Sequence, residues 1–208
     1  MDGVFMKKIL LLSVITVLLL KGTNCLELIQ ENQELKNGLI RLHVTANSDA
    51  LSDQEIKYKV KDSIVDYLNP LMENLPDKET AIAFLQKELK NIEKIAEDVL
   101  KIYGIDYDAS VTLQKETFDT RVYDTFSLPA GVYDSLRIQL GSGTGKNWWC
   151  VAFPALCVPR TEYEFADAAV SAGFDRELVE TISSTDDYEI RFFILDWLGK
   201  MENLLYEP

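Results

Sequence analysis

The sequence of 208 residues contains a single histidine, His43, and this scarcity limits the catalytic sites that it can build. A Ser-His-Asp or Cys-His site needs a histidine beside its nucleophile, and no such arrangement brackets His43. The residue falls on the polar side of an expected strand, which favours an ordinary surface or half-buried position. A hydrolase or metal-dependent enzyme that uses His43 and nearby acids such as Asp49 remains an alternative interpretation.

Cysteine is also scarce, because Cys25, Cys150 and Cys157 are the only three in the chain. Structural zinc sites take four ligands and usually include a closely spaced pair of cysteines. A site built from His43, Cys150 and Cys157 lacks both the close pair and a fourth ligand. We therefore expect no metal and no cofactor.

Basic residues are outnumbered, with 21 Lys and Arg against 34 Asp and Glu, so the formal net charge is −13. Nucleic-acid binding depends on clustered Lys and Arg, and we therefore expect no nucleic-acid partner. The same charge opposes contact with an anionic bilayer, so any membrane contact would need an apolar anchor. Plain solubility is an equally good explanation of the acidity.

The apolar run near the N-terminus is too short to cross a membrane as a stable helix. It covers twelve apolar or small residues, 9–20, and lysines flank it on both sides, whereas a spanning helix needs about 20. This pattern is typical of an export signal. We predict a cleaved signal peptide over residues 1–25 and a secreted protein. A retained anchor is the alternative, and lipidation of Cys25 is disfavoured because Asn24 precedes it where a small residue is expected.

The chain lacks a convincing phosphate-binding loop. Residues 141–146 read Gly-Ser-Gly-Thr-Gly-Lys, but Leu140 stands where the first glycine of that motif belongs, and Asn147 replaces the hydroxyl residue that would bind magnesium. A flexible hairpin-type connection is the better interpretation. No pair of carboxylates lies in an apolar context that would separate their pKa values, and we expect no small-molecule substrate.

The sequence does contain two amphipathic helical segments among strand-like ones. Residues 40–44, 111–113, 136–140 and 148–153 show strand patterns, while helices are expected from Ser52 to about Leu68 and from Asp77 to Gly104. Ser52 and Glu55 have the spacing of a capping box, and Asn69-Pro70 is expected to end the first helix. We predict an α+β fold of two layers, with an antiparallel or mixed sheet covered by helices. The predicted divisions are the signal peptide 1–25, a flexible leader 26–38, a domain 39–159 and a C-terminal helical extension 160–208 packed on it.

The most informative segment covers residues 147–157, where three aromatic residues, two cysteines and a proline occur together. In an exported protein Cys150 and Cys157 are expected to oxidise to a disulfide. The bond requires the chain to double back, since the two α-carbons must lie within about 7 Å, and Pro154 is well placed for a reversal. Trp148 and Trp149 are neighbours on an expected strand and should point to opposite faces. One is expected in the core and the other is a candidate recognition residue.

Two motifs, in this order, resemble those of the stage II sporulation protein R family. The resemblance covers about residues 39–159 behind the export signal, and Lys61 departs from it where Arg is expected. The first motif contains Arg41-Leu42-His43-Val44-Thr45-Ala46-Asn47-Ser48-Asp49, then Asp53-Gln54, Lys57, Lys59-Val60 and Asp62. The second contains Pro129-Ala130-Gly131 and Tyr133, then Asn147-Trp148-Trp149-Cys150-Val151, Phe153-Pro154, Leu156 and Cys157.

The resemblance implies a signalling protein of endospore formation and not an enzyme. Such a protein is exported into the space between the two membranes of the sporulating cell. There it activates a membrane-bound aspartic protease that processes a mother-cell sigma-factor precursor. We expect the contact with this protease to involve Asn47, Ser48 and Asp49 together with Trp148 and Trp149, because clustered aromatics held by a disulfide are pre-organised for binding. A cell-envelope binding module is a further alternative, and Asn47 to Asp49 could equally serve only to shape the turn into the first helix.

Overall fold

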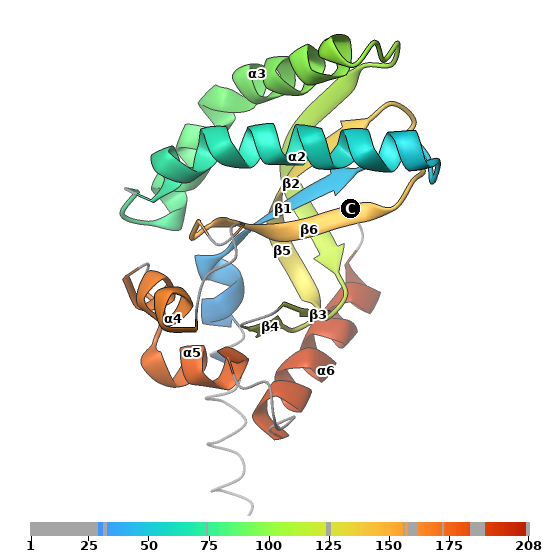
Figure 1. Ribbon diagram of the computed structural model, residues 1–208. Coiled ribbons are helices and arrows are strands. Elements are labelled where there is room, and N and C mark those ends of the chain that lie inside the picture. The colour runs from blue at the N-terminus through green and yellow to red at the C-terminus, as the bar shows by residue number, and fades with distance from the viewer. Residues whose placement is uncertain are drawn as a thin grey trace, which may run out of the picture.

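Figure 1 presents the computed structural model, in which a mixed sheet carries helices on both faces. It describes residues 29–30, 33–73, 75–123, 126–155, 157, 162–171, 173–183 and 190–206. The expected signal peptide, residues 1–25, lies outside the described residues. Within the described part of the chain, no helix is both long enough and apolar enough to cross a membrane.

The central sheet has four strands in the order β2-β5-β1-β6. β1 (Ile40–Thr45) lies parallel to β5 (Gly131–Leu140) on one side and antiparallel to β6 (Asn147–Phe153) on the other. β2 (Ala109–Phe118) pairs antiparallel with β5 and forms one edge, while β6 forms the opposite edge. The predicted α+β class with an antiparallel or mixed sheet is therefore confirmed, and the sheet is mixed. The prediction of two layers is wrong, because helices pack on both faces of the sheet.

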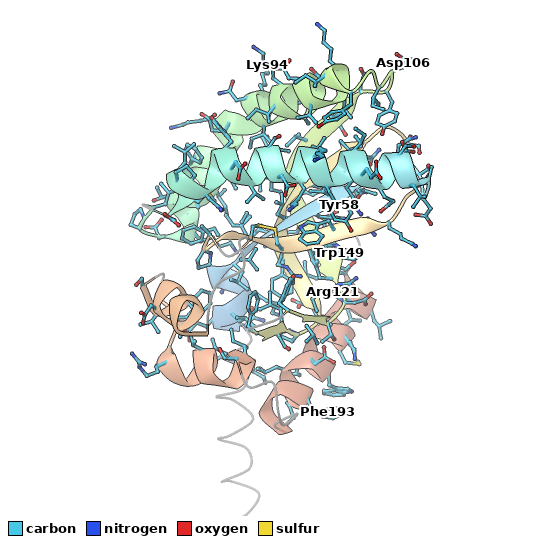
Figure 2. All side chains as sticks on the ribbon, in the orientation of Figure 1. Tyr58, Lys94, Asp106, Arg121, Trp149 and Phe193 are labelled. Carbon is cyan, nitrogen blue, oxygen red and sulfur yellow. A yellow bond between two sulfur atoms is a disulfide. The ribbon has the colours of Figure 1, made fainter. Side chains whose placement is uncertain are left out.

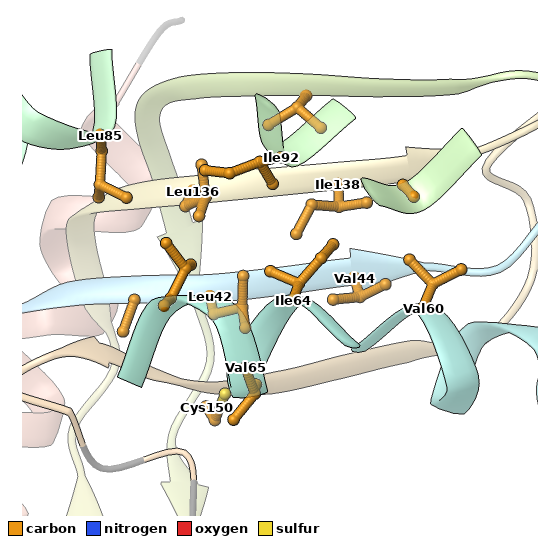
Figure 3. Close-up of a cluster of buried hydrophobic side chains, with 14 of the residues drawn as sticks. Leu42, Val44, Val60, Ile64, Val65, Leu85, Ile92, Leu136, Ile138 and Cys150 are labelled. Carbon is orange, nitrogen blue, oxygen red and sulfur yellow. The ribbon is translucent and has the colours of Figure 1, made fainter. Parts of the chain in front are cut away.

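Two long helices, α2 (Leu51–Met72) and α3 (Lys78–Ile102), cover one face of this sheet (Figure 1). Alternation in the strands sends every second side chain toward these helices, as the period of two requires. Figure 3 shows the resulting core. Its members include Leu42 and Val44 of β1, Val60 and Ile64 of α2, Leu85 and Ile92 of α3, and Leu136 and Ile138 of β5.

Two details of α2 differ from the sequence-based expectation. Its N-cap is Ala50, which makes no side-chain capping bond, so the predicted capping box of Ser52 and Glu55 is wrong. Pro70 does not end the helix, which continues to Met72. Pro70 cannot donate a backbone hydrogen bond, so the helix loses one bond where it continues past this residue. Met72 is itself buried in the core, which favours the extra turn.

The opposite face of the sheet is covered by elements from the N-terminal, middle and C-terminal parts of the chain. They are the helical residues 33–38, the short strands β3 (Arg121–Val122) and β4 (Ser127–Leu128), and the helices α4 (Glu162–Ser171), α5 (Arg176–Ser183) and α6 (Ile190–Leu205). A second apolar cluster joins them to the sheet and includes Leu35, Phe118, Val151, Leu178 and Leu195. The C-terminal helices thus pack on the sheet beside residues 33–38.

The leader was expected to be flexible and irregular throughout residues 26–38. Residues 33–38 are instead helical, and the side chain of Leu35 is fully buried. Gly38 packs so closely on Phe174 that a Cβ there would lie 2.2 Å from the phenyl ring. The polar composition of this segment did not indicate a packed helix, because the helix buries only one of its faces. The surface on which it packs comes from residues far along the chain.

Candidate functional site

β6 places the two neighbouring tryptophans on opposite faces of the sheet, as its alternation requires. Trp148 packs against the core beneath α2 and α3, and Trp149 against the second apolar cluster. Both side chains are half-buried. The expectation that one tryptophan is core and the other exposed is therefore too simple, because each rests on a core while keeping part of its surface at the edge of the sheet.

Trp148 lies among residues of α2. The ring of Tyr58 meets its indole edge-to-face at a centroid distance of 5.7 Å, and the Lys61 ammonium lies 5.0 Å from the indole centroid. A cation over an indole face is attracted by the negative charge of the ring face. Tyr58 is itself 43% exposed. This side of β6 therefore carries an aromatic pair with an adjacent cation, accessible from solvent.

Trp149 lies between a histidine and an arginine. Its indole stacks on the imidazole of His43, with centroids 5.5 Å apart and planes 21° apart, while the Arg121 guanidinium carbon lies 3.6 Å from the indole centroid. Figure 2 shows Arg121 and Trp149 next to each other below α2. The ring is thus held between two flat groups, which fixes its orientation with little remaining freedom.

A disulfide joins Cys150 to Cys157, with 5.2 Å between the α-carbons. The chain reverses between them at Pro154, whose peptide bond with Phe153 is cis. The half-cystine of residue 150 is buried in the core, directly after the two tryptophans. The disulfide therefore closes β6 on its C-terminal side and adds to the order of the strand that carries Trp148 and Trp149.

The turn from β1 to α2 is bonded internally and to the loop between β5 and β6. Asn47 donates from Nδ2 to Asp53 Oδ2 (2.9 Å) and accepts the backbone N–H of Ser142 at Oδ1 (2.9 Å). Ser48 donates from Oγ to the same Asp53 oxygen (2.6 Å). Asp49, which is exposed, accepts the Lys146 N–H (2.7 Å). These side chains hold two loops together, which is the structural role that the sequence left open for them.

Asp53 is the centre of this turn and is only 8% exposed. Hydrogen bonds from Ser48, Asn47 and Tyr107 outweigh the effect of burial and lower the pKa of its carboxyl. Gly145 lies so close to the Ser48 carbonyl that a Cβ would come within 2.2 Å of its oxygen. The glycine-rich loop therefore packs directly on the β1–α2 turn, and this close backbone contact explains why residue 145 is a glycine.

His43 and Glu116 form the polar part of the second sheet face. His43 Nδ1 donates to Glu116 Oε2 (3.1 Å), and Arg137 donates to Glu116 Oε1 (2.7 Å). Burial alone would raise the pKa of Glu116, but these bonds, led by that of His43, lower it to about 2. The other ring nitrogen of His43 lies 2.9 Å from Asn147 Oδ1. Both nitrogens of the only histidine therefore have polar partners, and Asp49 is not among them.

Arg41 lies on the same face and is fully buried. One terminal nitrogen donates to the Tyr123 hydroxyl (2.9 Å), and the guanidinium carbon lies 4.3 Å from the Phe118 centroid and 5.1 Å from that of Tyr133. Nε and Nη1 have no hydrogen-bond partner among the described residues. The aromatic rings therefore provide much of the environment that keeps this charge buried.

The arrangement of these motifs agrees with a known family. A family model described as stage II sporulation protein R matches residues 36–163, more than half of the chain. The chain belongs to the stage II sporulation protein R family. Family membership gives it a role in sporulation. The match includes the β1–α2 turn, both tryptophans and the disulfide, whereas α5 and α6 lie beyond it.

One curated relative supports the same assignment over a longer stretch. Stage II sporulation protein R of Bacillus subtilis (strain 168) is 29% identical over 192 residues, an alignment that covers 82% of this chain and 85% of the relative. No solved structure matches the chain.

Several residues around the tryptophans could not be picked out from the sequence. Tyr58 and Lys61 approach Trp148 from α2, whereas Arg121 approaches Trp149 from β3. Tyr58 and Lys61 are three apart, so a helical period places them on one side of α2, but nothing in that period indicates which strand they face. Arg121 lies in a two-residue strand that no alternation could reveal.

Proposed function

We propose that this protein is exported during endospore formation and activates a membrane-bound aspartic protease, which then processes a sigma-factor precursor. It acts by binding and carries out no chemistry of its own. The observation that carries the proposal is the family match over residues 36–163. It is supported by the state of His43, whose two ring nitrogens are engaged with neighbouring side chains, which leaves this histidine poorly placed as a general base.

We propose the β6 edge of the sheet as the surface that contacts the protease. Trp148 and Trp149 lie side by side on this edge strand and face opposite sides, so a partner that approaches the edge meets both of them. Tyr58 and Lys61 border the contact on the α2 side, and Arg121 borders it on the other. Rigid aromatic and arginine side chains commonly dominate interface energies. The adjacent turn, Asn47 to Asp49, supports this edge through the β5–β6 loop.

Co-expression of the chain with the candidate protease and its precursor tests the activation. We expect precursor cleavage only when all three proteins are present. Absence of cleavage with folded wild-type protein would contradict the activation. Cleavage of the precursor by this chain without the protease would contradict the non-enzymatic role.

A matched pair of tyrosines tests the contact surface separately. Tyr58 is 43% exposed beside Trp148, and Tyr103 is 52% exposed beyond the C-terminal end of α3. We expect Tyr58→Ser to reduce precursor cleavage per folded molecule and Tyr103→Ser to leave it unchanged. Equal cleavage by the two variants would exclude this side of the β6 edge from the contact, while the activation itself would still stand.

A further inference from the structure

The side of α6 that faces the domain packs Leu195 into the second apolar cluster and also makes polar contacts. Asp196 Oδ1 accepts the backbone N–H of Ala130 (2.9 Å), and Asn203 donates to the Phe118 carbonyl (2.8 Å). Gly199 lies so close to Ala130 that a Cβ would come within 1.5 Å of its carbonyl oxygen. These contacts occur along the length of the helix, so its rotation about its own axis is fixed.

The opposite side of α6 is apolar and faces solvent. Its large side chains are between 42% and 80% exposed. They recur every three or four residues, which places them on one face of the helix. Figure 2 shows Phe193 directed away from the rest of the molecule. We call this surface the α6 stripe, and it consists of Phe193, Trp197, Met201, Leu204 and Leu205.

The exposed stripe departs from the usual pattern of a helix on a protein surface, where the apolar residues face the core and the polar face meets water. Single exposed apolar residues are common and need no explanation. A continuous apolar stripe is different, because exposed patches of this kind mark sites of interaction. The inner contacts of α6 prevent the helix from turning the stripe inward, so the stripe is available to a partner.

The α6 stripe also differs in charge from the rest of this acidic molecule. The carboxylate of Asp196 pairs with Lys200 (2.7 Å), and that of Glu202 pairs with Lys36. Both carboxylates are thereby compensated, and Lys200 is the one charged residue exposed on the described outer face of α6. A chain of net charge −13 can therefore approach an anionic or neutral surface through α6 with little repulsion.

We propose that the α6 stripe rests on a lipid bilayer, with its apolar side chains inserted at the level of the headgroups. Helices that lie in this interface carry Trp, Phe and Leu on the inserted side, and Lys200 can keep its ammonium in water while its methylenes contact lipid. The contact is distinct from protease activation, because it concerns lipid and lies outside the residues of the family match.

The size of the stripe favours lipid over a second copy of the chain. Its five side chains expose on the order of 600 Å², if a whole large side chain contributes about 200 Å². A stable dimer of standard size buries roughly 800 Å² on each partner. The stripe alone falls short of that area, whereas a bilayer accepts a narrow apolar ridge without needing a complementary surface.

Flotation with phosphatidylcholine vesicles tests the proposal on the purified chain. The test variant carries Phe193→Ser, Trp197→Ser and Leu204→Ser, and the control carries Leu51→Ser, Ile102→Ser and Val122→Ser, whose side chains are at least 68% exposed elsewhere. All proteins keep the same N-terminus, so residues 9–20 contribute equally. We expect the test variant to bind vesicles at least about tenfold more weakly than wild type and the control to bind normally, because three large apolar side chains are lost from the contact.

Equal flotation of all three proteins, or no flotation of wild type, would overturn the proposal. Trp197 provides a second measurement, because the chain has three tryptophans and the other two lie on β6. With Trp148 and Trp149 replaced by Phe, lipid brominated in its acyl chains should quench the remaining fluorescence, and unquenched emission would contradict insertion. Dimers that form without lipid and disappear in the test variant would assign the stripe to a second copy instead.

Discussion

His43 and Trp149 are direct neighbours across the β1–β6 pair, and their rings stack at a centroid distance of 5.5 Å. The only histidine of the chain is therefore a packing partner of a tryptophan on the edge strand. Its ring nitrogens bond to Glu116 and Asn147 at the same time. Its position and its contacts together give the imidazole a structural role.

We expect His43→Phe to retain the ability to trigger precursor cleavage, because the phenyl ring preserves the stacking on Trp149. His43→Ala removes both the stacking and the polar contacts, and it should lower the free energy of unfolding by about 1–3 kcal/mol. Cleavage is measured per folded molecule and unfolding is followed in urea. If folded His43→Phe protein were inactive, the histidine would be needed for its chemistry, and the enzyme interpretation would gain support.

The lowered pKa of Glu116 should make the folding stability of the protein depend on pH. Its pKa is lowered from 4.5 to about 2 in the folded protein. A carboxyl with a lowered pKa contributes stability that is present above pH 4.5 and is lost as the pH falls toward 2. The full shift corresponds to at most about 3 kcal/mol. Glu116→Gln should therefore be less stable than wild type at pH 7, with a difference that narrows below pH 4.

The control for this prediction is Glu97→Gln, since Glu97 is exposed on α3. Its difference from wild type should be small at pH 7 and should vary little with pH. Urea unfolding at several pH values between 3 and 7 measures both variants. A constant difference between Glu116→Gln and wild type over this range would show that the native bonds of Glu116 do not depend on its charge.

The disulfide between Cys150 and Cys157 should stabilise the hairpin locally. The two residues are seven apart, and closing so short a loop contributes roughly 2.5 kcal/mol in the loop-entropy description. Cys150→Ala with Cys157→Ser should lower the free energy of unfolding by about this amount. Mass spectrometry of a non-reduced digest checks the bond itself. Two free thiols in folded exported protein would contradict it.

The strands and the two long helices could be predicted from the sequence because their signals are local. Two local patterns predict residues of the core in Figure 3. They are the alternation at Leu42 and Val44 and the helical repeat of Val60 and Ile64. The small strands β3 and β4 are too short to show a period. For residues 160–208 the sequence predicts a helical extension packed on the domain, without placing α5 in it.

The site was harder to predict because its order comes from contacts between distant parts of the chain. Trp148 and Trp149 stood out by composition, but their neighbours Tyr58 and Arg121 come from other elements. The sequence predicts that residues 160–208 pack on the domain, but periodicity gives the spacing of apolar residues and not the side they face. The exposed fractions of the side chains in the α6 stripe, the polar contacts of Asp196 and the close approach of Gly199 show that the apolar side points outward.

The β1–α2 turn can either hold the neighbouring loop in place or contact the protease, and substitutions at Asn47 and Asp49 distinguish these two roles. Asn47 joins Asp53 to the backbone of Ser142, so Asn47→Ala leaves partners on two loops without their bonds. The expected loss is about 1–3 kcal/mol of unfolding free energy. Asp49→Ala should cost less, because Asp49 is exposed and water can replace its contact with the Lys146 N–H.

Precursor cleavage then decides whether the turn also touches the protease. If the turn acts only as a support, folded Asn47→Ala protein should trigger cleavage as well as wild type does, and any loss of signal should follow the amount of folded protein. If Asp49→Ala folds normally but fails to trigger cleavage, the exposed carboxylate belongs to the contact. We expect the supporting role for Asn47, because both the nitrogen and the oxygen of its side-chain amide are already bonded within the protein and join Asp53 to the β5–β6 loop.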